Sequence, residues 1–297
     1  MRSLAPRPIA SLGRRLRKAY RARKRNGTPA LGEAQFRDLL VDRLQIDRCD
    51  IVLVHSSLDG LRLDFPWFRL LGLLRDVVGP RGTLLFPTYP RGLSSDFLRE
   101  GAAFDVRATQ SYTGALSELA RRTAGAVRSL HPTKSLCALG PAAEELCGTH
   151  HLSRYPYDAT SPYWKLAQSG GKTIGLGVST ARMSLVHAVD DFFKETFPVQ
   201  VYLPGVFRAA CIDAAGRTVV VETFAHDVTK MRHDVPRYCR RNLPPEMCQD
   251  LKIGSTEFFR ADAKPLLEAM VARASRGITI YPRSVQTRKD ASRCASD

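Results

Sequence analysis

"DIVLVHSSLDG", residues 50–60, joins a run of apolar residues to a polar end made by His55, Ser56 and Ser57. The apolar run predicts a buried strand, which has no need of hydroxyl groups at its end. In α/β sheets, ligands bind just beyond the carboxyl ends of strands, where these two serines lie. A serine that caps the following helix needs no ligand and, for the pair taken alone, is the favoured alternative. The stretch therefore predicts an α/β sheet, with either a ligand contact or a helix cap at its edge.

Outward from this stretch, apolar runs of strand length alternate with helical patterns as far as residue 195. This alternation predicts an α/β fold: a single-domain layered fold with a mixed central sheet flanked by helices. A polar loop is expected over residues 89–110, and a hairpin-like segment over 200–224 suggests the antiparallel part of the sheet. Residues 257–274 are expected to form a strand, a turn and a helix. Three parts result: a basic N-terminal extension (1–29), a globular domain (30–282) and a polar C-terminal tail (283–297).

The charge of the chain is concentrated in the N-terminal extension. The formal net charge is +16, and ten Lys and Arg residues lie between positions 2 and 25 with no acidic residue among them. Ile9, Leu12, Leu16 and Tyr20 would share one stripe of a helix. Residues 1–26 are therefore either a solvated leader or a peripheral helix on an anionic membrane surface. Nucleic-acid binding is disfavoured, because no zinc-finger or RNA-binding signature follows.

The location is expected to be cytoplasmic, with the inner membrane face as the site of any peripheral contact. The extension lacks the apolar stretch of a secretory signal, and the chain has no run of 18 apolar residues. The seven cysteines show no C-x-x-C spacing, which favours a reducing compartment over a disulfide framework or a structural zinc site.

A second polar cluster is "RSLHPTKS", residues 128–135. It places Arg128, His131, Thr133 and Ser135 before a predicted strand. A cation, an imidazole and two hydroxyl groups suit an anion, but they also suit a turn whose polar groups bond one another.

A third cluster is "MSLVHAVDDF", residues 183–192. On a helix, His187 and Asp190 lie on one face with Cβ atoms about 5–6 Å apart, and Asp191 is an alternative partner. A carboxylate beside an imidazole fixes the ring tautomer and raises its basicity. A half-buried histidine in a local ion pair is the structural alternative.

Several signatures are missing from the sequence. It contains no G-x-G-x-x-G, no G-x-x-x-x-G-K-[ST], no G-x-S-x-G and no H-E-x-x-H. The adjacent His150 and His151 are expected to be exposed instead of ligating. Dehydrogenase chemistry, nucleotide hydrolysis and metal hydrolysis therefore have no support in the sequence, and no metal is expected.

In series, these segments resemble the aminoglycoside 3-N-acetyltransferase family over about residues 30–195. The matching segments, in family order, are "VHSSL" (54–58), "VVGPRGTLLFPT" (77–88), the run from "YTGALSEL" to "ELCGTH" (112–150), "SPYWKL" (161–166), "GKTIGLGV" (171–178) and "LVHAVDDF" (185–192). The resemblance implies an α/β fold distinct from the GCN5-related acetyltransferase fold. It also implies acetyl-CoA as donor and direct acetyl transfer to an amine, without a metal.

The resemblance assigns roles to individual residues. His187 corresponds to the histidine of the family's H-x-x-E motif, the general base, and Asp190 stands where the family has glutamate. Ser184 replaces a usual threonine and would serve the oxyanion or the pantetheine. Residues expected to contact the coenzyme or to wall its site are Ser56, Ser57, Thr113, Gly114, Arg128, His131, Ser135 and Ser184.

The acceptor is less well specified. Some family members carry an acidic residue after the second strand, where this chain has "TYPRG" with Arg91. Acidic residues expected to bind a polycationic aminoglycoside are Asp105, Asp158, Asp190, Asp191 and Glu222. The acceptor is a small-molecule amine, either an aminoglycoside, in an antibiotic-resistance enzyme, or a nucleotide-linked amino sugar of surface-polysaccharide biosynthesis. A third alternative is an inactive family member that binds nucleic acid or lipid. The oligomeric state stays open, a homodimer included.

Overall fold

The computed structural model describes residues 29–229 and 231–282. The predicted membrane-contacting segment 1–26 and the polar tail 283–297 lie outside the described residues. Both stay predictions, as does the homodimer. Among the residues described, no helix has the length and apolar character needed to cross a bilayer.

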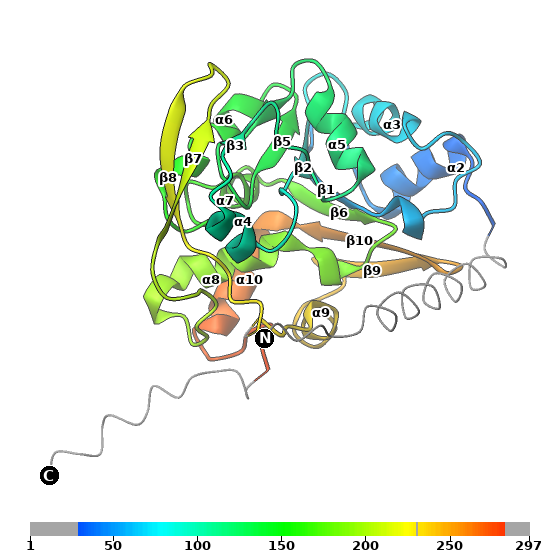
Figure 1. Cartoon of the computed structure of the whole chain (residues 1–297). Coiled ribbons are helices and arrows are strands. Elements are labelled where there is room, and N and C mark those ends of the chain that lie inside the picture. Colours follow the sequence, from blue (N-terminus) through cyan, green and yellow to red (C-terminus); the bar gives the residue numbers. More distant parts are fainter. Residues whose placement is uncertain (1–28, 230, 283–297) are drawn as a thin grey trace, which may run out of the picture.

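The central sheet of the described chain has seven strands in the order β4-β5-β2-β1-β6-β10-β9 (Figure 1). The strands are β1 (Ile51–Ser56), β2 (Thr83–Pro87), β4 (Val127–Arg128), β5 (Leu136–Leu139), β6 (Lys172–Leu176), β9 (Cys248–Ile253) and β10 (Thr256–Asp262). The three in the middle, β2, β1 and β6, run parallel. Antiparallel strands flank them on both sides. The predicted mixed sheet is confirmed.

Helices cover both faces of this sheet (Figure 1). They are α2 (Glu33–Asp38), α3 (Arg69–Val78), α4 (Ser94–Glu100), α5 (Ala115–Arg122), α6 (Ala143–Cys147), α7 (Pro162–Gln168), α8 (Ala188–Phe193), α9 (Val235–Asn242) and α10 (Ala263–Ala274). Helix α7 begins as its sequence predicts: Ser161 caps the Trp164 N–H and Pro162 opens the first turn.

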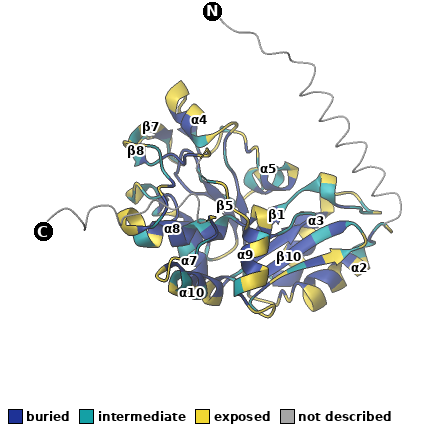
Figure 2. Ribbon diagram, turned by 90° about the horizontal axis from the view of Figure 1, so that it is seen from below, coloured by how far each residue is buried: buried dark blue, intermediate teal, exposed yellow. Residues whose placement is uncertain are grey.

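The apolar residues of β1 pack into two hydrophobic clusters, one on each face of the sheet. Side chains alternate across a strand, so Val52 and Val54 join the buried cluster beneath α2, α3 and α5. Leu53 points to the opposite cluster, beneath α7, α8 and α10. Figure 2 shows the central strands mostly buried and the exposed residues gathered on the helices and loops outside them. A strand buried on both faces explains why the run is continuously apolar.

The hairpin-like segment does not extend the central sheet. Strands β7 (Phe207–Ile212) and β8 (Thr218–Thr223) pair with β3 (Phe104–Asp105) in a separate three-stranded sheet within the described residues. The antiparallel part of the central sheet comes instead from β4, β5, β9 and β10. The expected loop 89–110 was also wrong, because it contains α4 and β3. Its Phe97 and Phe104 are buried against Cys211 and Val221, so the segment has a core of its own.

Two glycines bring the loops after β1 and β6 into contact. A Cβ atom added at Gly60 would lie 2.1 Å from the carbonyl oxygen of Gly177, which itself has a φ of +73°. Such a contact forces backbone to move. The loops can therefore sit side by side at the sheet edge only with glycine at position 60.

We predict that Gly60→Ala lowers the free energy of unfolding by about 1–3 kcal/mol, because the new methyl group overpacks against backbone. Chemical denaturation of purified protein measures this loss. Gly72→Ala is the matched control: it lies in α3, and a methyl group added there would have no atom within 4 Å. Alanine there should leave stability unchanged or raise it. Equal midpoints for Gly60→Ala and the parent protein would contradict the prediction.

Candidate active site

A large cavity opens at the carboxyl ends of the three parallel strands. Its volume is about 1280 Å³, and its wall includes Ser56 and Ser57 after β1, Pro87 at the end of β2 and Gly177 after β6. Pockets for small ligands usually measure about 300–1000 Å³. This one therefore has room for a long, extended ligand.

The serine pair at the end of β1 faces this cavity and does not act as a helix cap. Ser57 precedes the short 3₁₀ turn Leu58–Gly60, but its side chain makes no capping hydrogen bond. The Ser56 hydroxyl is buried and has no hydrogen-bond partner among the described residues. A buried hydroxyl left without a partner costs free energy, so a ligand atom is the natural partner. Of the two alternatives that the sequence left open, the helix cap is therefore excluded.

Other parts of the cavity wall suit an anionic ligand. Thr113 and Gly114 lie there at the N-terminus of α5, where the helix dipole favours negative charge. Arg182 and Lys252 also line the cavity, and both are exposed. Sequence reasoning missed these two cations. Nothing in their local sequence marks them, since Arg182 follows β6, Lys252 lies in β9, and only the fold brings them together.

Arg128, His131 and Ser135 are not part of this wall. Arg128 is buried, stacks on Phe104 and donates hydrogen bonds to the carbonyl oxygens of Val106, Thr109 and Thr88. Its Nε donates to the Thr88 and Ser135 hydroxyl groups, so most of its donors are used inside the protein, and its side chain does not line the large cavity. The assignment of Arg128 to the coenzyme is therefore withdrawn.

The two neighbours of Arg128 in the cluster are equally committed. The Ser135 hydroxyl donates to Thr88 O at 2.8 Å. His131 is fully buried, stacks on His150 at 4.4 Å and accepts from the Lys134 N–H at 3.0 Å. His150, expected to be exposed, is fully buried as well. The alternative of an internally bonded turn explains these side chains, and they too leave the set of coenzyme contacts.

The predicted pair of His187 and Asp190 is formed. The helix expected within residues 183–192 is divided: a 3₁₀ turn (Ser184–His187) leads directly into α8. His187 Nδ1 lies 3.0 Å from Asp190 Oδ2, and the Tyr281 hydroxyl donates to the same oxygen at 2.6 Å. An oxygen that accepts two hydrogen bonds fits a carboxylate facing an Nδ1–H group. The lone pair of the ring then resides on Nε2.

The surroundings keep this imidazole neutral. The His187 side chain is 12% exposed and Asp190 is 1% exposed. Burial lowers the pKa of His187, and the nearby charge of Lys134 lowers it further. Burial raises the pKa of Asp190, and the Tyr281 hydrogen bond opposes that rise. A neutral ring whose Nε2 bonds to none of the described residues can accept a proton.

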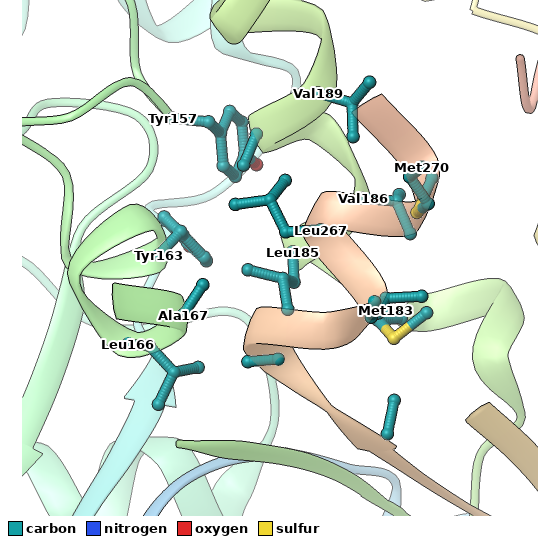
Figure 3. Close-up of a cluster of buried hydrophobic side chains, with 14 of the residues drawn as sticks. Tyr157, Tyr163, Leu166, Ala167, Met183, Leu185, Val186, Val189, Leu267 and Met270 are labelled. Atoms are coloured by element: carbon teal, nitrogen blue, oxygen red, sulfur yellow. The ribbon is translucent and has the colours of Figure 1, made fainter. Parts of the chain in front are cut away.

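Apolar packing holds this segment in place. Leu185, Val186 and Val189, which flank His187, belong to the same buried cluster as Leu267 and Met270 of α10 (Figure 3). The alternative partner, Asp191, is committed elsewhere. It is 1% exposed and accepts hydrogen bonds from the Tyr157 N–H and the Tyr202 hydroxyl. Asp190 therefore orients the ring, and Asp191 fastens α8 to neighbouring segments.

Ser184 lies in the wall of the large cavity beside a second histidine. Its hydroxyl is 2.9 Å from His55 Nε2, and its backbone N–H points to the same nitrogen at 3.2 Å. Burial lowers the pKa of His55 to about 4. His55 is therefore neutral and holds Ser184 by accepting from it. The opening stretch contained this histidine, but its sequence gave no reason to assign it a role.

A smaller cavity of about 350 Å³ adjoins the large one. The residues that line both cavities are Tyr89, Lys134, Tyr157, His187 and His233. His187 thus lies in a wall shared by two spaces. A group bound in either space is within reach of the same ring.

The acids predicted to bind an acceptor do not line either cavity. Asp105 accepts hydrogen bonds from the Arg107 and Ala108 N–H groups. Glu222 lies on β8 of the hairpin and forms an ion pair with Arg154. Asp191 is a buried residue of α8, and Asp158 accepts hydrogen bonds from the Ser153 and Thr160 hydroxyl groups. Their side chains satisfy local turns and strand contacts, so the assignment of Asp105, Asp191 and Glu222 to the acceptor is withdrawn.

Comparison with known proteins identifies the family to which the sequence belongs. The family model described as aminoglycoside 3-N-acetyltransferase matches residues 53–275.

The chain belongs to the aminoglycoside 3-N-acetyltransferase family.

Individual relatives agree. Aminoglycoside N(3)-acetyltransferase IX of Micromonospora chalcea is 27% identical over 238 residues, which cover 73% of this chain and 84% of that protein. Aminoglycoside N(3)-acetyltransferase VII of Streptomyces paromomycinus is 35% identical over 180 residues, 55% of this chain and 61% of that protein. The crystal structure of aminoglycoside acetyltransferase AAC(3)-Xa superposes with a TM-score of 0.69 at 25% identity, covering 89% of this chain and 99% of that one. The predicted family and fold are confirmed, and the protein is an N-acetyltransferase by family.

Proposed function

We propose that this enzyme transfers the acetyl group of acetyl-CoA to a primary amine of an aminoglycoside or another amino sugar. The donor occupies the large cavity and the acceptor the smaller one. The observation that carries the proposal is the position of His187 in the wall shared by both cavities, with Nε2 unoccupied. Transfer without an enzyme-bound intermediate needs both substrates at one base.

The residues present fit this reaction. An ammonium group cannot attack a thioester, so His187 takes a proton from the acceptor at Nε2. Asp190 holds the ring and stabilises the imidazolium that results. As negative charge grows on the acetyl oxygen, the Ser184 hydroxyl can turn its proton from His55 Nε2 toward that oxygen, while the Ser184 backbone N–H still points to the histidine. Expulsion of the thiolate restores the carbonyl, the proton held on His187 returns to the leaving sulfur, and the second proton that the nitrogen loses on becoming an amide passes to solvent.

Names of related structures support both substrates. A structure described as AAC-IIIb binary with CoASH shares the fold at a TM-score of 0.68 and 21% identity. AAC-VIa bound to sisomicin shares it at a TM-score of 0.68 and 21% identity. Ser56, Ser57 and the N-terminus of α5 are the residues we propose for the coenzyme, together with Arg182 and Lys252 at the exposed part of the cavity.

The charge in the smaller cavity favours a second candidate acceptor, a nucleotide-linked amino sugar. Lys134 lines this cavity, and none of the described residues in its wall is acidic. The inactive-protein alternative is weakened by the His187–Asp190 pair, whose contact distance is that of a working hydrogen bond. Release of free thiol from acetyl-CoA, with mass spectrometry of the acetylated amine, tests the proposal. No thiol release with any amino sugar or aminoglycoside would remove it.

We predict that the double variant Arg182→Glu/Lys252→Glu raises KM for acetyl-CoA by about tenfold at low ionic strength, because two cations near the phosphates become anions. The effect should shrink as salt is added, and kcat should change little. Lys264→Glu, an exposed position on α10 away from both cavities, is the charge-matched control. If the double variant and Lys264→Glu have the same KM for acetyl-CoA, the coenzyme phosphates do not bind near Arg182 and Lys252.

A further inference from the structure

The smaller cavity contains a cation without a counter-ion. Lys134 is half-buried, and its Nζ lies 5.0 Å from the centroid of the Tyr89 ring. Its ammonium group makes no ion pair and no hydrogen bond with the residues the structure describes. Burial lowers the pKa of Lys134 to about 8, so the side chain is largely charged at neutral pH. A buried charge that lacks a partner is costly, and a functional site is the usual place for one.

Two further side chains of the same wall lack partners. The Thr133 hydroxyl and both ring nitrogens of His226 are buried and make no hydrogen bond within the described part of the chain. Thr133 is 3% exposed and His226 is 4% exposed. Both line the smaller cavity next to Lys134. Buried polar groups are nearly always hydrogen-bonded in native proteins, so two neighbouring side chains without partners beside a half-buried cation indicate a missing ligand.

The character of these groups defines the ligand. An ammonium group can only donate, and a hydroxyl and a neutral imidazole can each donate one hydrogen bond. The cavity volume of about 350 Å³ is at the low end for small-molecule sites. None of the described residues that line this cavity is acidic. Lys134 would therefore repel a compound with several ammonium groups, and no carboxylate of the described lining would offset that repulsion. The cavity thus suits a small, singly aminated compound that carries negative charge.

We propose that the acceptor is a small amine bearing a carboxylate or phosphate group, which Lys134 binds together with Thr133 and His226. This inference rests on the proposed acetyl transfer and names the class of its acceptor. The anion site lies beside the base, since His187 and Lys134 line the same cavity. Recognition of the anion and deprotonation of the amine therefore take place within one small compound.

Binding of the anion also assists the base. The charge of Lys134 is one of the two causes that lower the pKa of His187. An anion paired with Lys134 cancels part of that charge, which raises the basicity of the imidazole. A neutral or polycationic acceptor leaves the field of Lys134 in place. The correct acceptor therefore makes His187 a stronger base than a wrong one does.

Rates with matched acceptors test this. Glucosamine, glucosamine 6-phosphate, the corresponding uronic acid and kanamycin are compared by thiol release, in the parent enzyme, Lys134→Met and Lys134→Arg. We expect the parent to prefer the phosphate or carboxylate compound by kcat/KM, and Lys134→Met to reduce that preference by about 10- to 100-fold. Lys134→Arg keeps the positive charge and should retain most of the preference for the anionic acceptor. Lys264→Met, on the surface of α10, is the matched control and should leave the preference unchanged.

Calorimetry without a donor gives an independent readout. Glucosamine 6-phosphate should bind the parent enzyme and lose affinity in Lys134→Met. If glucosamine or kanamycin is the better acceptor, or if Lys134→Met keeps the anionic preference, the inference is overturned while acetyl transfer stands. If no amine reacts but the phosphate compound binds through Lys134, the anion site stands and the proposed function falls. Absence of both reaction and binding overturns both.

Discussion

We expect that replacing His187 by alanine lowers kcat/KM for acetyl transfer by about 10²–10⁴-fold, the usual contribution of a positioned base. The ring is held by Asp190 at 3.0 Å, and no other histidine of the described chain combines a carboxylate partner with a place in both cavities. Stopped-time assays of thiol release with saturating acetyl-CoA measure the loss. The KM for acetyl-CoA should stay close to that of the parent enzyme, because the ring acts on the acceptor.

Two further variants make this result specific. Asp190→Asn keeps the size of the side chain but removes the charge that stabilises the imidazolium, and should lose part of the rate. His151→Ala removes a histidine that lines a different pocket, near Arg128, and should leave the rate unchanged. An unaltered rate in His187→Ala would exclude it as the base. Loss of rate in both histidine variants would indicate unfolding instead, which circular dichroism would reveal.

We expect that replacing Arg128 by alanine lowers the free energy of unfolding by about 3 kcal/mol or more, because several buried carbonyl groups lose their donor. The guanidinium group bonds Val106, Thr109 and Thr88, and thereby ties the segment after β3 to the end of β2. Denaturant titration measures the loss. The KM for acetyl-CoA of the folded fraction should equal that of the parent enzyme.

Arg122→Ala is the control for Arg128→Ala. Arg122 is an exposed neighbour in sequence that pairs with Glu118, and removal of such a surface ion pair costs about 0–1 kcal/mol. If Arg128→Ala leaves stability intact and raises KM for acetyl-CoA, the sequence-based contact with the coenzyme is right and the structural role is wrong.

The parts of the site that could be predicted are those encoded by local spacing. His187 and Asp190 are three residues apart, and this places them on one face whether the backbone is 3₁₀ or α-helical. The Ser56–Ser57 pair follows an apolar run that must be a strand, so its place at the sheet edge was fixed by chain order. The alternation of strand and helix patterns predicted the layered fold for the same reason.

The parts that could not be predicted depend on contacts between distant segments. Arg182 and Lys252 are 70 positions apart in the sequence, and pairing of β10 with β6 and β9 brings them to one cavity. In "RSLHPTKS", the sequence shows which groups are polar but not which find partners inside the protein. The side chains of Arg128 and Ser135 have hydrogen-bond partners among the described residues, whereas the Thr133 hydroxyl and the Lys134 ammonium group have none. The hairpin at 207–223 has the pattern of any strand pair, and only its packing on Phe104 sets it apart from the central sheet.

The two cavities are built from different parts of the chain. Strand ends of the central sheet form much of the large cavity, while the described residues of the connections 89–97 and 226–233 supply most of the wall of the smaller one. These connections flank the small second sheet and carry none of the parallel strands. Under the proposed assignment of the cavities, replacement of these two connections would therefore change which compound is modified and leave the strand ends around the large cavity untouched.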